Sequence, residues 1–119
     1  MITVSFLLRP ESRKLSLTLS GHAGAAEIGH DIVCAGASIL ACTVAQEAKN
    51  METRGQLAEP PVIRMKEGDT EIVVRPKDSQ EYKEAHHTFY VAQVGYSLLA
   101  HNYPQYVEVK KLTEADSKP

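Results

Sequence analysis

A histidine and a cysteine stand twelve residues apart in the stretch GHAGAAEIGHDIVCAGAS, residues 21–38. The ordinary pKa of histidine lies near neutrality, so His22 can serve as a general base and a general acid. The thiolate of Cys34 can serve as a nucleophile. A cysteine and a histidine within hydrogen-bond reach form an activated pair, in which the imidazole takes the thiol proton and later delivers it to a leaving amine.

The residues around Cys34 predict where its sulfur lies. Residues 31–51 are rich in alanine and nearly apolar all round, a pattern typical of a buried helix. Asp31 carries the short carboxylate favoured at a helix N-cap, which puts Cys34 in the first turn. Unpaired N–H groups and the positive end of the helix dipole favour the thiolate there and can also receive an oxyanion. Ser38, one turn further on, is a candidate for hydrogen bonding the sulfur or a substrate.

Glycines surround the histidine and precede the helix. Gly21 and Gly24 free the backbone around His22 for positive φ or for close approach of a substrate backbone, and Gly29 can act as a hinge. A mobile flap over the cysteine would exclude water and admit an extended peptide. The residues that we assign to this substrate loop are Gly21, Gly24, Glu27, Gly29 and His30.

Each of these residues also has a structural interpretation. Cysteine is among the most buried residue types, so Cys34 can be core packing. His22 can be a surface turn residue, Asp31 only a cap, and Ser38 a small packing residue. Asp31 as an N-cap alone is the better interpretation than Asp31 as a third catalytic member, because a close carboxylate opposes thiolate formation.

A zinc site formed by His22, His30 and Cys34 is the metal alternative. No two of these ligands have the close spacing of a structural zinc motif, and His86 and His87 point to different faces of their predicted helix. We therefore expect no metal and no cofactor.

Composition and charge narrow the class of protein. With 119 residues the chain has room for one domain, residues 1–119, and 43% of the residues are hydrophobic. The net charge of −2 argues against a sequence-independent nucleic-acid binder, which needs a broadly positive surface.

The sequence also bears on the compartment. It contains no uninterrupted apolar run of about 18 residues and no basic start of a signal peptide. Cys34 and Cys42 are eight residues apart on one predicted helix, about 12 Å of rise, too far for a disulfide. Reduced thiols indicate the cytoplasm.

Hydrophobic periodicity predicts seven elements in the order β-β-α-β-β-α-β. Alternation of apolar and polar residues marks strands, and apolar residues at steps of three and four mark the second helix. The fold class is α+β: a single-domain α/β sandwich with a mainly antiparallel sheet and two long helices on one or both faces. The predicted elements are strands 2–8 and 15–20, helix 31–51, strands 62–65 and 70–75, helix 79–101, and strand 106–110.

The motifs G-H-A-G and G-x-D-I-V-C-A, followed by Ser38, resemble the signature of the ribosomal-processing cysteine proteases, the Prp family, and the resemblance covers the full chain. It implies a cytoplasmic homodimeric peptidase that removes the short N-terminal extension of a large-subunit ribosomal protein. It also implies that Cys34 and His22 form a dyad, that the loop of residues 24–30 opens for substrate, and that an apolar pocket lies beside Cys34. Asp31 and Ser38 are carried over only as supporting residues.

Two hypotheses of different classes follow. The leading one is a cysteine endopeptidase of narrow specificity, acting on a ribosomal protein precursor without membrane or direct nucleic-acid contact. The alternative is a non-catalytic module of ribosome assembly or interaction in which Cys34 is buried. Thiol redox sensing is a third interpretation, which predicts inactivation by mild peroxide and recovery with reductant.

Overall fold

The computed structural model describes residues 1–22 and 30–112, with the backbone alone for His30 and Asp31. Seven elements follow one another in the predicted order. They are β1 (Ile2–Arg9), β2 (Lys14–Gly21), α1 (His30–Thr53), β3 (Val62–Lys66), β4 (Asp69–Val74), α2 (Ser79–Asn102) and β5 (Val107–Leu112). The predicted α+β class is confirmed.

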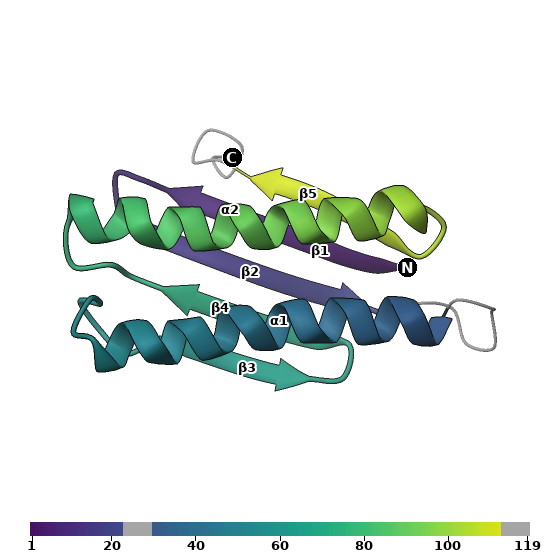
Figure 1. Cartoon of the computed structure of the whole chain (residues 1–119), viewed down its shortest axis with the longest axis horizontal. Coiled ribbons are helices and arrows are strands. Elements are labelled where there is room, and N and C mark those ends of the chain that lie inside the picture. The colour runs from purple at the N-terminus through teal and green to yellow at the C-terminus, as the bar shows by residue number, and fades with distance from the viewer. Residues whose placement is uncertain (23–29, 113–119) are drawn as a thin grey trace.

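The strands form one mixed sheet in the order β3-β4-β2-β1-β5. Three neighbouring pairs are antiparallel, and β5 alone runs parallel to its neighbour β1. Both helices lie side by side on one face of the sheet, as Figure 1 shows. Burial in β1 alternates residue by residue, which indicates that one face of the sheet carries the core.

The core lies between the sheet and the two helices. The stripe of α2 that periodicity predicts is buried against the sheet: Tyr82, Ala85, Phe89, Ala92 and Tyr96. From the sheet, Phe6 meets the ring of Tyr96 edge to face, with 6.0 Å between ring centroids. This contact joins the middle of β1 to the C-terminal half of α2.

Small residues let the helices approach each other closely. A Cβ on Gly36 of α1 would lie 3.3 Å from the Leu99 side chain, and one on Gly95 of α2 would lie 2.9 Å from Leu40. The hydroxyl of Tyr96 donates a hydrogen bond to the carbonyl of Ala37 across this contact, at 2.8 Å. The first half of α1 is thereby fixed against α2.

By length and composition, helix α1 is apolar enough over Ile32–Thr53 to cross a membrane, although polar residues interrupt its apolar sequence. Core helices of folded domains meet the same criterion. One side of α1 packs into the hydrophobic core through residues such as Val33, Ala37 and Val44, which are at most 3% exposed. In all, 33% of the apolar window of α1 is buried within the fold.

Candidate active site

His22 directly follows the last residue of β2 and is exposed. Its backbone carbonyl accepts a hydrogen bond from the α-ammonium group of Met1. Its ring lies against the turn between β3 and β4. The contact is so close that a Cβ on Gly68 would lie 2.6 Å from Nε2 of the ring. Sequence reasoning predicted this hairpin but not its contact with the histidine, because periodicity does not tell which turn meets which strand end.

Gly21 has the positive φ, +90°, that sequence analysis proposed for it. A Cβ at this position would lie 2.4 Å from the carbonyl oxygen of Met1. Only glycine fits without a shift of the backbone. The bend that leads the chain out of β2 into His22 is therefore built on this residue.

Cys34 is half-buried and packs against the hydrophobic core. Helix α1 begins at His30, so Cys34 is its fifth residue and opens the second turn. In an α-helix that starts there, the N–H of Cys34 pairs with the carbonyl of His30. The helix start at His30 favours a paired N–H at Cys34, and the role of this N–H toward an oxyanion stays a prediction. The sulfur still lies within about two turns of the positive end of the helix.

Asp31 is the second residue of α1 and not its N-cap, which corrects the predicted helix start by one residue. Aspartate is favourable both at the N-cap and in the first turn, because its carboxylate interacts with the positive end of the helix dipole. The residue type thus did not distinguish the two positions. His30 was assigned to the substrate loop, but its backbone is helical.

The remaining loop residues, Gly24, Glu27 and Gly29, lie outside the described part of the chain. Ser38 lies one helical turn after Cys34, as predicted, and is exposed. Its roles toward the sulfur and a substrate stay predictions.

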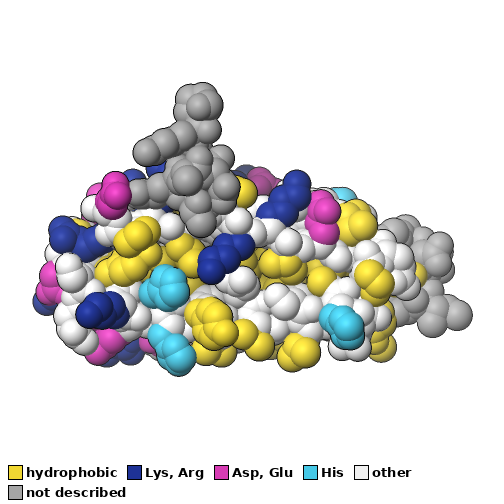
Figure 2. Space-filling model, turned by 90° about the horizontal axis from the view of Figure 1, so that it is seen from above, with side chains coloured by type: hydrophobic (Ala, Val, Ile, Leu, Met, Phe, Trp, Pro, Cys, Tyr) yellow, Lys and Arg dark blue, Asp and Glu magenta, His cyan; other side chains and the backbone are white. Residues whose placement is uncertain are grey.

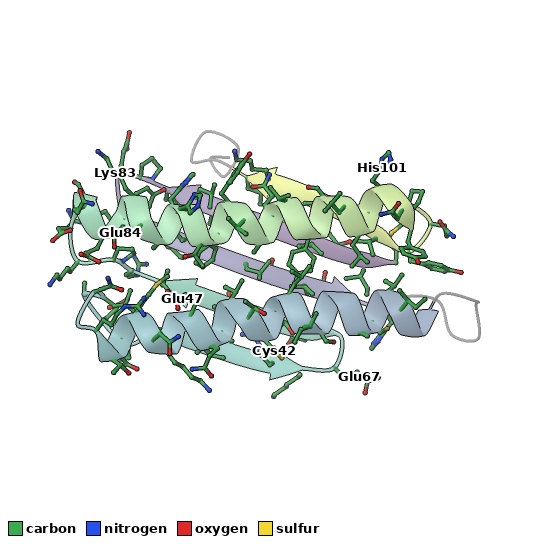
Figure 3. All side chains as sticks on the ribbon, in the orientation of Figure 1. Cys42, Glu47, Glu67, Lys83, Glu84 and His101 are labelled. Carbon is green, nitrogen blue, oxygen red and sulfur yellow. The ribbon has the colours of Figure 1, made fainter. Side chains whose placement is uncertain are left out.

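The end of β2 and the start of α1 lie at the same end of the molecule, where the undescribed residues 23–29 connect them (Figure 1). His22 and Cys34 therefore come from neighbouring ends of consecutive elements. The β3–β4 turn reaches the same end, where Figure 3 shows Glu67. The end of β2, the start of α1 and the β3–β4 turn thus lie at one end of the molecule, and the turn contacts His22.

Cys42 differs from its predicted role as inert packing, because it is exposed and lines a shallow groove with residues such as Ile39 and Gln46. Figure 3 shows it on the side of α1 that faces away from α2. The helix is covered only where it faces the sheet and α2, so an apolar sequence did not ensure burial. Within residues 1–22 and 32–112, no three His, Cys, Asp or Glu side chains are placed to hold a metal ion together.

Comparison with known proteins decides the family. The sequence model of a family described as cysteine protease Prp matches residues 1–108. The chain belongs to the cysteine protease Prp family. This Prp family member is 50% identical over 40 residues to the ribosomal processing cysteine protease Prp of two Staphylococcus aureus strains, Mu50 and NCTC 8325. The matched segment spans 34% of this chain and 38% of those relatives.

Solved structures share the fold over nearly the whole length. The crystal structure of SMU.848 from Streptococcus mutans matches with a TM-score of 0.68 and 27% identity, covering 96% of each chain. The essential ribosomal processing protease Prp of S. aureus in complex with a substrate peptide matches with a TM-score of 0.61 and 26% identity, covering 94% of this chain and 100% of that chain. The structure of the same S. aureus protease with a covalently linked product peptide matches with a TM-score of 0.59 and 27% identity, over the same shares of the two chains.

Proposed function

We propose that this Prp family member is a cysteine endopeptidase that uses Cys34 as nucleophile and His22 as general base and acid. The observation that carries the proposal is the likeness over 94% of the chain to the S. aureus Prp that holds a covalently linked product peptide. A covalent peptide product is what a nucleophilic cysteine protease forms. The motif that contains His22 and Cys34 lies within the family match.

The chemistry proceeds in two halves. His22 takes the proton of the Cys34 thiol, and the thiolate attacks the carbonyl carbon of the scissile peptide bond. The C–N bond then breaks as His22 returns the proton to the leaving amine, which leaves a thioester on Cys34. Water, deprotonated by His22, hydrolyses the thioester and restores the thiol.

The substrate that we propose is the precursor of a large-subunit ribosomal protein, from which the enzyme removes a short N-terminal extension. The relatives named ribosomal processing proteases support this substrate class. The exposed position of His22 also supports a peptide substrate, because a peptide can reach this side chain from solvent.

The test compares two cysteine variants on the same helix. Purified protein is incubated with a synthetic peptide that spans the N-terminal extension of a large-subunit ribosomal protein from the same genome, and the products are followed by mass spectrometry. We expect Cys34→Ala to abolish cleavage and Cys42→Ala, a substitution at an exposed thiol, to leave it within about twofold. His22→Ala should lower kcat by at least about 100-fold. Equal cleavage by Cys34→Ala and the wild type refutes the assignment.

Alkylation separates the peptidase from a non-catalytic module and must allow for the exposed Cys42. In a Cys42→Ala background, iodoacetamide reports on Cys34 alone. A nucleophilic Cys34 reacts faster than Cys42 does in a Cys34→Ala background, although Cys42 is the more exposed thiol. Slower labelling of Cys34 than of Cys42 favours the assembly module.

Two further expectations belong to this proposal. We propose a homodimer, supported by exposed apolar side chains along the helices, among them Ile39, Val91 and Leu98. An apolar groove of about 270 Å³ between α1 and α2 lies in the same region. Figure 2, seen from the side of α2 and β5, shows hydrophobic side chains exposed on that side of the molecule. Analytical ultracentrifugation that finds only monomer at micromolar concentration contradicts the dimer.

We also place the enzyme in the cytoplasm. The absence of a disulfide at Cys34 and Cys42 supports a reducing compartment. Cell fractionation with an antibody against the protein tests this placement, and recovery in a membrane or secreted fraction contradicts it.

A further inference from the structure

The turn between β3 and β4 touches the ring of His22 through a residue that has no side chain. A Cβ on Gly68 would lie 2.6 Å from Nε2 and 2.7 Å from Cε1 of His22. Real side chains do not approach a ring atom this closely, since carbon and nitrogen atoms repel well before that distance. The imidazole therefore fills the space that any other residue at position 68 would need.

The backbone of this turn is fixed relative to His22. The N–H of Gly21 donates a hydrogen bond to the carbonyl of Gly68 at 3.1 Å, and Ser20 pairs with Asp69 in the β2–β4 ladder. The residue before the histidine and the residue beneath its ring thus belong to one hydrogen-bonded unit. Gly68 has φ +74°, a conformation that glycine adopts without steric cost.

Arg64 links the two strands of the β3–β4 hairpin by hydrogen bonds between side chains. Arg64 on β3 donates hydrogen bonds to both carboxylate oxygens of Asp69, at 2.9 and 3.2 Å, and to Glu71 at 2.9 Å. The hydrogen bonds from Arg64 lower the pKa of Asp69 below its ordinary value. The turn consists of only two residues, Glu67 and Gly68, between the paired residues Lys66 and Asp69. The hydrogen bonds of Arg64 and of the Gly21 N–H restrict its movement.

His22 lacks the support that a core side chain has. It is exposed, so close packing does not fix the torsions of its side chain, and a general base must hold its ring in one orientation to work. The contact with Gly68 supplies one wall against which the ring can rest.

We infer that Gly68 is a positioning residue for the catalytic histidine: its missing side chain lets the imidazole of His22 rest on the β3–β4 turn, which orients the ring for proton transfer with Cys34. The inference rests on the proposed dyad. A side chain at position 68 displaces the ring while both catalytic groups remain in the chain.

The matched pair Gly68→Ala and Gly55→Ala isolates the contact. Gly55 has φ +71°, close to that of Gly68, but a Cβ there meets no atom of the described residues within 4 Å. Both substitutions introduce comparable backbone strain, and Gly68→Ala alone displaces a ring. We expect Gly68→Ala to lower kcat on the precursor peptide by about tenfold or more with KM within about twofold, and Gly55→Ala to leave both within about twofold.

A double-mutant cycle keeps the inference testable without activity. Thermal unfolding is measured for Gly68→Ala in the wild-type and in the His22→Ala background. We expect the loss in Tm to be smaller where the ring has been removed. If the loss is the same in both backgrounds, the ring does not occupy the space at position 68 and the inference fails.

The outcomes separate this inference from the proposed function. If His22→Ala cleaves the peptide as fast as the wild type, the dyad is wrong. If His22→Ala is inactive but Gly68→Ala keeps the kcat of Gly55→Ala, the dyad stands and the positioning role of Gly68 is refuted.

Discussion

Replacing Tyr96 with phenylalanine tests the buried contact between the two helices. The Tyr96 side chain is 0% exposed, and its hydroxyl donates to the carbonyl of Ala37. A buried hydrogen bond between neutral groups contributes about 0.5–1.5 kcal/mol net, and the Ala37 carbonyl keeps its helical partner when the hydroxyl is removed. We expect Tyr96→Phe to lower the free energy of unfolding at pH 7 by about 1 kcal/mol and Tm by about 3–5 °C.

The same substitution should have less effect in alkaline solution. Burial raises the pKa of Tyr96 above its ordinary value of about 10, with a smaller contribution from Cys42. The unfolded chain therefore loses this proton first as the pH rises, and the stability that the wild type has below pH 10 declines above it. For each pH unit above about 10, the free energy of unfolding of the wild type falls by about 1.4 kcal/mol, whereas that of the phenylalanine variant does not fall for this reason. The difference of about 1 kcal/mol between the two proteins should vanish near pH 11.

Urea unfolding between pH 7 and pH 11, with reductant present, measures this difference directly. Other tyrosines titrate in both proteins and cancel in the comparison. Tyr90→Phe is the matched control, because Tyr90 is exposed on the same helix, and it should change stability by less than about 0.5 kcal/mol. The reasoning is wrong if Tyr96→Phe is as stable as the wild type at pH 7, or if the gap stays constant up to pH 11.

Three further predictions concern stability and the site. Gly21→Ala should lower the free energy of unfolding by about 2 kcal/mol or more, because φ is positive and the new Cβ clashes with the Met1 carbonyl. It should also lower kcat. A melting curve equal to that of the wild type contradicts this prediction. Burial, with a smaller contribution from Lys111, lowers the pKa of His86, so stability is complete above about pH 6.5 and declines as pH falls below it. His86→Gln should flatten that decline in urea midpoints between pH 7.5 and 5.5, and an unchanged slope rejects the reasoning. Phe89→Ala, at a side chain 1% exposed, should cost about 3–5 kcal/mol by calorimetry, and a loss below about 1 kcal/mol would falsify its core position.

The elements could be predicted from the sequence because each carries a strong local signal. Alternation in residues 2–8 and the stripe of α2 gave strand and helix correctly, with ends that differ by at most two residues. The parallel pairing of β5 with β1 could not be predicted, since alternation is the same in parallel and antiparallel strands. The sequence also could not predict that both helices cover the same face of the sheet, because the pattern of an amphipathic helix does not indicate which face of a sheet it packs against.

The site was predictable at the level of residue types and not of contacts. Gly21 needs positive φ, as the glycine beside the histidine suggested. The contact of Gly68 with His22 joins residues that are far apart in the chain, and no local pattern records such a meeting. The exposure of Cys42 was missed for a similar reason, because the open side of α1 depends on what the rest of the fold leaves uncovered.

The sheet order has a consequence for how the chain folds during synthesis. Strand β1 is made long before β5, yet β5 is one of its two neighbours in the sheet. Until β5 arrives, an inner strand has a bare row of backbone donors and acceptors along one edge. The nascent protein therefore completes this five-stranded sheet only after residues 107–112 have left the ribosome. A chain arrested before them should remain open to proteases and to wrong strand partners.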